Sequence, residues 1–295
     1  MFTSSENGYS GLSLALGYFD GVHIAHQKVI ETAVEFARKN GVKSAVVTFN
    51  NHPAELLGKN VEYIMSLSAR NKILKTLGVD YIFSVDFDEK LLKTTCDEYL
   101  QMLVKNFAPS AIVTGFNHTF GKQGCGKPEF LRENQEKFGY KYFEIEPEVL
   151  GGEIVSSSLI RRKLIEGDIV SANLLLGREF FIEGEVIRGN QIGTKIGFPT
   201  ANVAYPDKFV KVPFGVYSAK VEIWGRTYKA ILNYGIKPTL NGSHSPVAEA
   251  HILGFDEDIY GEKIKILINN MIRKEQKFSS LVELKNQIAK DIQAC

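Results

Sequence analysis

The sequence predicts an α/β domain with a mostly parallel sheet, followed by an antiparallel β domain that ends in one helix. In the first half, strand-like apolar runs alternate with helix-like segments. After Gly177, short segments rich in Val, Ile, Tyr and Gly alternate with turn signals such as Asn241-Gly242. The 295 residues suffice for two ordinary domains. We therefore expect domains at residues 1–176 and 177–295.

Composition narrows the class of protein. Hydrophobic residues make up 44% and charged residues 23%, as in soluble globular proteins. A net charge of +1 gives no support to a nucleic-acid or membrane-surface partner. We expect neither a signal peptide nor a membrane span. Three widely spaced cysteines, Cys96, Cys125 and Cys295, argue against a disulfide framework and favour a reducing cytoplasm.

The elements expected in the first half support a sheet covered on both faces. Helix-like segments are a pattern after residue 23 with apolar positions Val29, Ile30, Ala33, Val34 and Ala37, then 67–77, 97–107 and 128–138. Strand-like segments are 12–16, 43–49, 81–85, 110–114 and 140–145. Ligands of parallel sheets lie beyond the carboxyl ends of strands. Three stretches fall there: Gly17–His26, Thr48–Pro53 and Gly115–Gly121.

The second half predicts an antiparallel barrel or sandwich. Two helices, 156–165 and 169–176, come before it, separated by Gly167-Asp168. The expected strands are 181–187, 215–223, 227–232, 248–253 and 263–268. A last amphipathic helix over 279–292 would bury a face made of Leu281, Leu284, Ile288 and Ile292.

The stretch Gly17–His26 is the first candidate site, because it reads as a strand end, a glycine-containing turn and a helix start. His23 and His26 would share one face of the first helical turn. Free N–H groups and the helix dipole favour a phosphate there. Alternatively, the histidines cap or pack, or they bind zinc, for which no third cysteine or clustered carboxylate is evident.

Three further stretches could carry chemistry. The hydroxyls of Ser156–Ser158, with Arg161 one turn on, could bind a triphosphate or merely cap a solvated helix. Thr200 and Asn202 in Gly197–Asn202 offer hard oxygen ligands for Mg²⁺ beside a nucleotide, or form an ordinary barrel turn. The residues around them do not form a Walker-type phosphate loop.

Glu249 and His251 would share one face of a strand. On an inner barrel face, the carboxylate of Glu249 could accept a proton from a substrate hydroxyl. On an outer face, both residues would be ordinary solvated polar side chains. The sequence does not decide between the two faces.

These motifs resemble the prokaryotic bifunctional riboflavin kinase/FAD synthetase (FMN adenylyltransferase) family over about residues 11–292. In the first half the resemblance rests on Gly17–His26, Thr48–Pro53, Gly115–Gly121 and Ser156–Arg161. In the second half it rests on Gly197–Asn202, Pro213–Tyr217, Asn233–Thr239, Glu249–His251, Asp258–Gly261, Arg273–Phe278 and the final helix.

The resemblance implies two ATP-dependent reactions that use Mg²⁺. A Rossmann-like nucleotidylyltransferase domain would join FMN to the AMP part of ATP, giving FAD and pyrophosphate. A six-stranded antiparallel Greek-key barrel with a C-terminal helix would phosphorylate the ribityl hydroxyl of riboflavin, giving FMN. The partners implied are riboflavin, FMN and ATP, and the oligomeric state is left open. Adenylyl transfer needs no covalent intermediate, so the protein would supply positioning and charge stabilisation.

The resemblance also implies roles for individual residues. In the first domain, His23 and His26 would stabilise charge on the phosphates. Around them, the nucleotide would be held by Gly17, Phe19, Asp20, His52, Asn117, Ser157, Ser158 and Arg161. In the barrel, Glu249 would be the general base, and Thr200 and Asn202 would hold Mg²⁺ and phosphates. Gly193 and Lys195 would lie in a loop that closes on ATP.

Four positions depart from the family pattern. Ala25 stands where the family has glycine, Asn51 where proline is usual, Phe116 where an acidic residue is common, and Gly254 where aspartate is frequent. Three of them fall in the first half, so a second interpretation is a riboflavin kinase whose first domain binds nucleotide or flavin with weak or no adenylyl transfer. A third is a nucleotidylyltransferase-like domain acting on another substrate, with the barrel as an interaction module.

Overall fold

The computed structural model describes residues 10–189, 192–206, 208–236 and 246–295. The chain divides into two compact units, one up to Ser157 and the other from Ser158 onward. In these described ranges, no helix is long and apolar enough to cross a bilayer. The turn expected at Asn241-Gly242, the motif residues Lys237–Thr239, and Asn190-Gln191 in the barrel loop lie outside the described residues.

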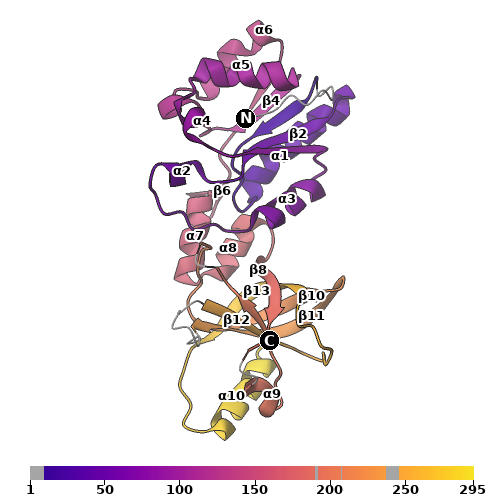
Figure 1. The fold of residues 1–295 in the computed structure, drawn as a ribbon, viewed down its shortest axis with the longest axis vertical. Helices are drawn as coiled ribbons and strands as arrows, with labels where there is room; N and C mark the ends of the chain where they lie inside the picture. The colour runs from indigo at the N-terminus through magenta and orange to yellow at the C-terminus, as the bar shows by residue number, and fades with distance from the viewer. Residues whose placement is uncertain (1–9, 190–191, 207, 237–245) are drawn as a thin grey trace. The chain divides into compact units, whose positions relative to one another are not determined.

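The first unit runs from indigo to magenta in Figure 1. It contains a five-stranded parallel sheet in the order β3-β2-β1-β4-β5. Its strands are β1 (Ser13–Leu16), β2 (Ser44–Phe49), β3 (Tyr81–Val85), β4 (Ala111–Gly115) and β5 (Lys141–Ile145). Its longer helices are α1 (Ile24–Asn40), α3 (Leu67–Thr76), α5 (Cys96–Phe107) and α6 (Pro128–Phe138). The α/β prediction is therefore confirmed, with the central strand β1 between β2 and β4.

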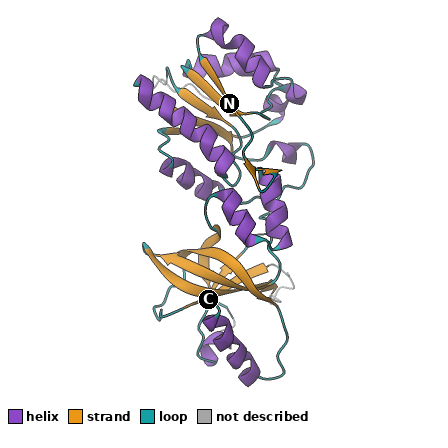
Figure 2. Cartoon of the chain, turned by 180° about the vertical axis from the view of Figure 1, so that it is seen from behind, coloured by secondary structure: helices purple, strands orange, loops and turns teal. Residues whose placement is uncertain are grey.

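Helices cover both faces of this sheet (Figure 2). Helix α1 packs on β1, β2 and β4 through the five apolar positions expected from the sequence. On the other face, Leu100 and Leu103 of α5 join a core with Leu14 and Leu16, because alternate strand residues point to opposite faces. Thr95 begins α5 through a reciprocal capping bond with Glu98. These layers place the candidate stretches at the carboxyl edge of the sheet.

The second unit is a closed barrel of six antiparallel strands in the order β10-β11-β12-β9-β8-β13. The strands are β8 (Phe180–Ile187), β9 (Ala201–Ala204), β10 (Gly215–Ile223), β11 (Arg226–Ile236), β12 (Pro246–Ile252) and β13 (Lys263–Lys274). Helices α7 (Ser157–Glu166) and α8 (Ile169–Leu176) precede it, and α10 (Leu281–Gln293) follows. Strands β11 and β13 run past the ends expected from the sequence.

The structure adds short elements that the sequence did not predict. They are α2 (Pro53–Leu56), α4 (Glu89–Lys93), the 3₁₀ turn η1 (Lys122–Gly124), the β6 (Val149–Leu150) and β7 (Glu153–Ile154) hairpin, and α9 (Ile192–Lys195). Residues 201 and 202, expected in a loop, begin strand β9. One prediction for α10 is wrong: Leu281 is 61% exposed, because it is the first residue of the helix and precedes the turns that carry Leu284 and Ile288 into a cavity wall.

We expect Leu100→Ala to lower the free energy of unfolding of the first unit by about 3 kcal/mol, since it removes a fully buried side chain and leaves a cavity. Leu57→Ala is the matched control, because Leu57 is 60% exposed and should change stability by less than about 0.5 kcal/mol. Denaturant unfolding measures both. Equal effects of the two variants would contradict the position of this core.

Candidate active sites

The turn between β1 and α1 has a strained backbone. Phe19 (φ 59°) and Val22 (φ 39°) both lie in the left-handed region, which costs side chains with a Cβ on the order of 1–3 kcal/mol each. A Cβ at Gly17 would lie 2.8 Å from the ring of Phe19, so only glycine fits there. The turn between β1 and α1 thus has a backbone conformation that is energetically unfavourable for most residues.

The two histidines of the turn pack against each other. His23 is the N-cap of α1: its Nδ1 accepts the backbone N–H of His26 at 3.2 Å. The two rings stack with centroids 3.5 Å apart. Because Nδ1 of His23 is an acceptor, the neutral ring carries its proton on Nε2. The capping role considered from the sequence is therefore real.

Asp20 and Ser157 fasten the same turn. The buried carboxylate of Asp20 accepts the N–H of Ile64, with both oxygens at 3.2 Å. The hydroxyl of Ser157 donates to the backbone carbonyl of Asp20 at 2.9 Å. The structure therefore brings Ser157 to the turn, as expected. Ser158 and Arg161 follow on α7, within the second compact unit.

The segment after β2 contacts this turn. His52 caps α2 through Nδ1, which accepts the N–H of Ala54 at 3.1 Å, and its ring lies edge-on to Tyr18 at 4.7 Å. Asn117 is exposed in the loop after β4. In that loop, burial of the ring lowers the pKa of His118 to about 4, so this histidine is neutral at physiological pH. The segments that follow β1, β2 and β4 thus carry residues that the sequence predicted for the first site.

In the barrel, three polar residues stand side by side on adjacent strands. Glu249 of β12 pairs in register with Asn202 of β9 on one side and with Asn233 of β11 on the other. These side chains line one cavity of about 630 Å³, together with Thr200 and His251. The same-face prediction for Glu249 and His251 is confirmed, and that face is the cavity wall.

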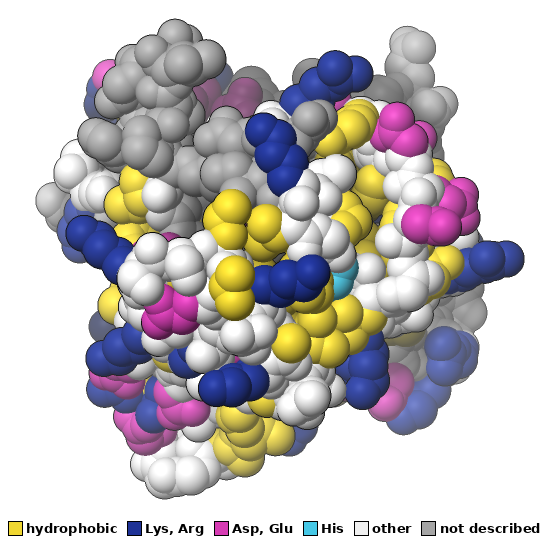
Figure 3. All heavy atoms as spheres, turned by 90° about the horizontal axis from the view of Figure 1, so that it is seen from below, with side chains coloured by type: hydrophobic (Ala, Val, Ile, Leu, Met, Phe, Trp, Pro, Cys, Tyr) yellow, Lys and Arg dark blue, Asp and Glu magenta, His cyan; other side chains and the backbone are white. Residues whose placement is uncertain are grey.

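The cavity combines this polar row with an apolar wall. Phe198, Val216 and Ile231 line it from the barrel, and Leu284 and Ile288 line it from α10. On the face drawn in Figure 3, hydrophobic side chains gather around a histidine, with lysine or arginine side chains beside them. A flat aromatic molecule with polar groups at one end suits such a lining.

The loop before β9 separates two hollows. His251 Nδ1 lies 2.8 Å from the carbonyl oxygen of Pro199 and holds the loop to β12. Thr200 lines both the large cavity and a smaller one of about 240 Å³, whose wall includes residues 255–260. A Cβ at Gly193 would lie 2.3 Å from the carbonyl oxygen of Phe198, so glycine is required at this approach. Lys195 is exposed and does not line either cavity.

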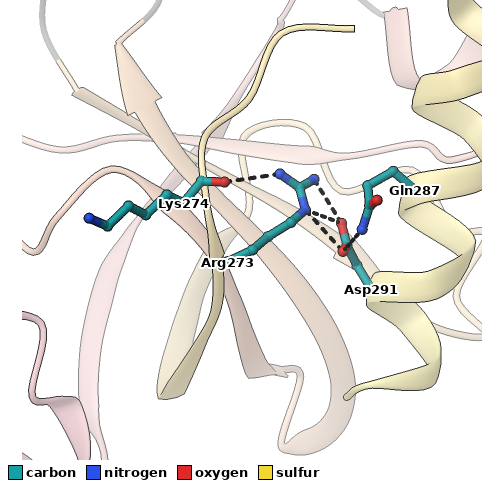
Figure 4. A network of polar contacts seen from close by, with 4 residues as sticks. All are labelled: Arg273, Lys274, Gln287 and Asp291. Atoms are coloured by element: carbon teal, nitrogen blue, oxygen red, sulfur yellow. Dashed lines mark hydrogen bonds and ion pairs between the residues drawn. The ribbon is translucent and has the colours of Figure 1, made fainter.

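A buried ion pair ties α10 to the barrel beside the large cavity (Figure 4). The Nε and an Nη of Arg273 donate to both carboxylate oxygens of Asp291, the shortest contact being 2.8 Å. Gln287 donates to the same carboxylate at 2.8 Å. Asp291 is 2% exposed, so this fork fixes the helix that carries the apolar wall.

Sequence reasoning assigned no role to Asn233, Arg273 or Asp291. Asn233 and Arg273 lie in stretches that carried the family resemblance. The sequence therefore showed their motifs, but it did not show which residues they contact. Asp291 gave no signal, because an aspartate near the end of an amphipathic helix usually faces solvent. Only the register of the barrel and the position of α10 bring the three together.

Comparisons with known proteins agree over nearly the whole chain. A family model described as FAD synthetase matches residues 6–159, and one described as riboflavin kinase matches residues 176–295. The bifunctional riboflavin kinase/FMN adenylyltransferase of Bacillus subtilis is 37% identical over 95% of this chain and 90% of its own length. The enzyme of the same name from Escherichia coli K12 is 32% identical over 97% and 92%.

A solved structure has the same fold over the full length. It is a crystal structure named as a macrolide-efflux protein from Streptococcus pneumoniae. Its sequence is 30% identical, the match covers 100% of this chain and 97% of that one, and the TM-score is 0.90.

We expect Asp291→Ala to destabilise the second unit by about 3 kcal/mol, because it leaves the Arg273 guanidinium without its buried carboxylate. The double variant Arg273→Met/Asp291→Leu should recover most of this loss, since it removes both charges. Lys290→Ala, at an exposed neighbouring position, is the control. Thermal unfolding gives all three values, and wild-type stability of Asp291→Ala would show that the pair does not hold the helix.

Proposed function

This chain belongs to the family of bifunctional riboflavin kinases/FMN adenylyltransferases, and from this premise we propose which of its residues carry each reaction. The enzyme phosphorylates riboflavin to FMN with ATP and adenylylates FMN to FAD, with release of pyrophosphate. Because each half matches its own family model, the two-activity function holds over the kinase-only alternative. We place the functional boundary at residues 176/177, where α8 ends and β8 follows.

For the kinase, Glu249 is the general base that takes the proton from the ribityl 5′-hydroxyl of riboflavin. The observation that carries this assignment is its position between Asn202 and Asn233 on the wall of the large cavity. The apolar wall opposite suits the isoalloxazine ring. The smaller hollow on the other side of Thr200 suits ATP, so the phosphates of ATP would lie beside Thr200, between the two hollows. Gly193 and Lys195 would flank these phosphates from the loop before β9.

Mg²⁺ fits this place by the chemistry of the donors. The Thr200 hydroxyl and the Asn202 amide oxygen are hard oxygen ligands on neighbouring positions. The Asn202 amide nitrogen donates to the Thr200 carbonyl at 3.1 Å, which orients this side chain. When bound, the ion would neutralise charge on the transferred phosphate. We propose these two residues as its protein ligands.

For adenylyl transfer, the turn at Gly17–His26 is the α-phosphate site. His23 and His26 would donate to the phosphate charge that develops in the transition state, which is supported by the proton held on Nε2 of His23. Gly17, Phe19 and Asp20 shape the nucleotide pocket, while His52 and Asn117 line it. Ser157, Ser158 and Arg161 would hold the β- and γ-phosphates at the start of α7.

The cytoplasm is the proposed compartment. The three cysteines of the chain, Cys96, Cys125 and Cys295, are free thiols, as is usual in a reducing compartment. ATP, which both reactions consume, is the co-substrate.

Glu249→Gln should lower kcat for FMN formation by about 10²- to 10⁴-fold, because the amide cannot accept the hydroxyl proton. FAD formation from added FMN should be unchanged. The purified protein is incubated with ATP, Mg²⁺ and either flavin, and the products are separated by chromatography. His26→Gln is the reciprocal control: this variant should lose FAD formation and keep FMN formation. FMN formation at the wild-type rate in Glu249→Gln would refute the base assignment.

Ala25→Gly should raise kcat for FAD formation several-fold, because a Cβ in the first turn of α1 restricts how closely a phosphate approaches the backbone. The substitution should also lower helix stability by up to about 1 kcal/mol. Steady-state rates with FMN as substrate measure the first effect. An unchanged rate in a folded variant would mean that Ala25 does not limit the reaction.

A further inference from the structure

Arg70 is a buried cation beneath the carboxyl edge of the parallel sheet. It stands on α3 and is only 2% exposed. Its Nη1 donates to the carbonyl oxygen of Tyr18 at 3.0 Å, and its Nη2 donates to the carbonyl oxygen of Phe49 at 3.0 Å. One rigid, planar group therefore spans the ends of two neighbouring strands, β1 and β2.

Both bonded segments lead into the proposed adenylyltransferase site. Tyr18 begins the turn that ends at His23 and His26, and Phe49 is three residues before His52. The Tyr18 ring lies 5.3 Å from the guanidinium carbon and edge-on to the His52 ring. Any shift of Arg70 would therefore move the two histidine-bearing segments relative to each other.

The bonding partners of Arg70 are unusual for a buried charge that only stabilises the fold. In the described part of the chain, its acceptors are carbonyl and hydroxyl oxygens rather than a carboxylate, and its Nε has no acceptor. Burial lowers the pKa of the guanidinium, and the charge of Asp20 opposes this shift. Burying a charge without a bonded counter-charge costs several kcal/mol, so arginine is a costly residue at this position.

We propose that Arg70 is a positioning residue for adenylyl transfer. Its guanidinium sets the spacing between the His23–His26 pair at the start of α1 and His52 at the start of α2. It also adds positive charge behind the site of the nucleotide phosphates. This inference rests on the proposed location of the adenylyltransferase site.

The test compares Arg70→Met and Arg70→Lys in the full-length protein. Arg70→Met should lower kcat for FAD formation about 100-fold, since small misplacements of reacting groups have effects of this size. KM for ATP should change by less than about threefold, because ground-state contacts remain. Arg70→Lys keeps the charge but reaches one carbonyl at most, so its kcat should fall in between. Phosphorylation of riboflavin by the same molecules should stay at the wild-type rate.

The controls separate positioning from simple destabilisation. Arg38→Met makes the same substitution at an exposed position on α1 and should leave both reactions unchanged. If Arg70→Met does not fold, Arg70→Lys decides: a lower kcat with unchanged KM and unfolding temperature supports the proposal. Wild-type kcat in folded Arg70→Lys and Arg70→Met would overturn it. If His26→Gln kept FAD formation, the proposed adenylyltransferase site itself would be wrong. If His26→Gln lost FAD formation while the folded Arg70 variants kept the wild-type rate, only the role of Arg70 would be rejected.

Discussion

Backbone groups at the carboxyl ends of parallel strands have no further strand to pair with, and the first unit is built around this constraint. Its central strand β1 ends between β2 and β4, so the turn that follows cannot extend the sheet. The carbonyl of Tyr18 instead accepts bonds from the Thr48 hydroxyl and from Arg70. The turn then tightens through the left-handed residues Phe19 and Val22, which brings the N-terminus of α1 to the sheet edge.

The barrel is a closed sheet, and it positions its functional groups differently. Its strands satisfy their backbone groups in a closed ladder, so its functional groups are side chains placed by register. Asn202, Glu249 and Asn233 form a row because β9, β12 and β11 are neighbours. Adenylyl transfer, which depends on positioning and charge, suits a site with backbone and dipole donors. Phosphorylation of a hydroxyl also needs a base, which a rigid strand can hold.

Much of the fold followed from periodicity. The five apolar positions expected on the first helix are its five buried residues, and the helix predicted over 128–138 has these bounds. Prediction was weaker where tertiary contacts decide: residues 201 and 202 form a strand only because β12 and β8 flank them. The site residues were named from motifs, whereas Arg70 and Asp291 were missed, because a single charged residue in an amphipathic helix gives no sign of burial.

A departure from a family pattern has to be judged by the contacts of the residue that replaces it. Asn51 stands where proline is usual, yet its side-chain amide accepts the N–H of Phe87 at 2.8 Å and donates to the Phe87 carbonyl at 3.0 Å. A proline side chain could make neither bond. The two bonds continue the pairing of β2 with β3 beyond Phe49, in place of the rigidity that proline would supply. The segment carrying His52 is thus fixed by a different interaction, so the substitution at this position is no argument against adenylyl transfer.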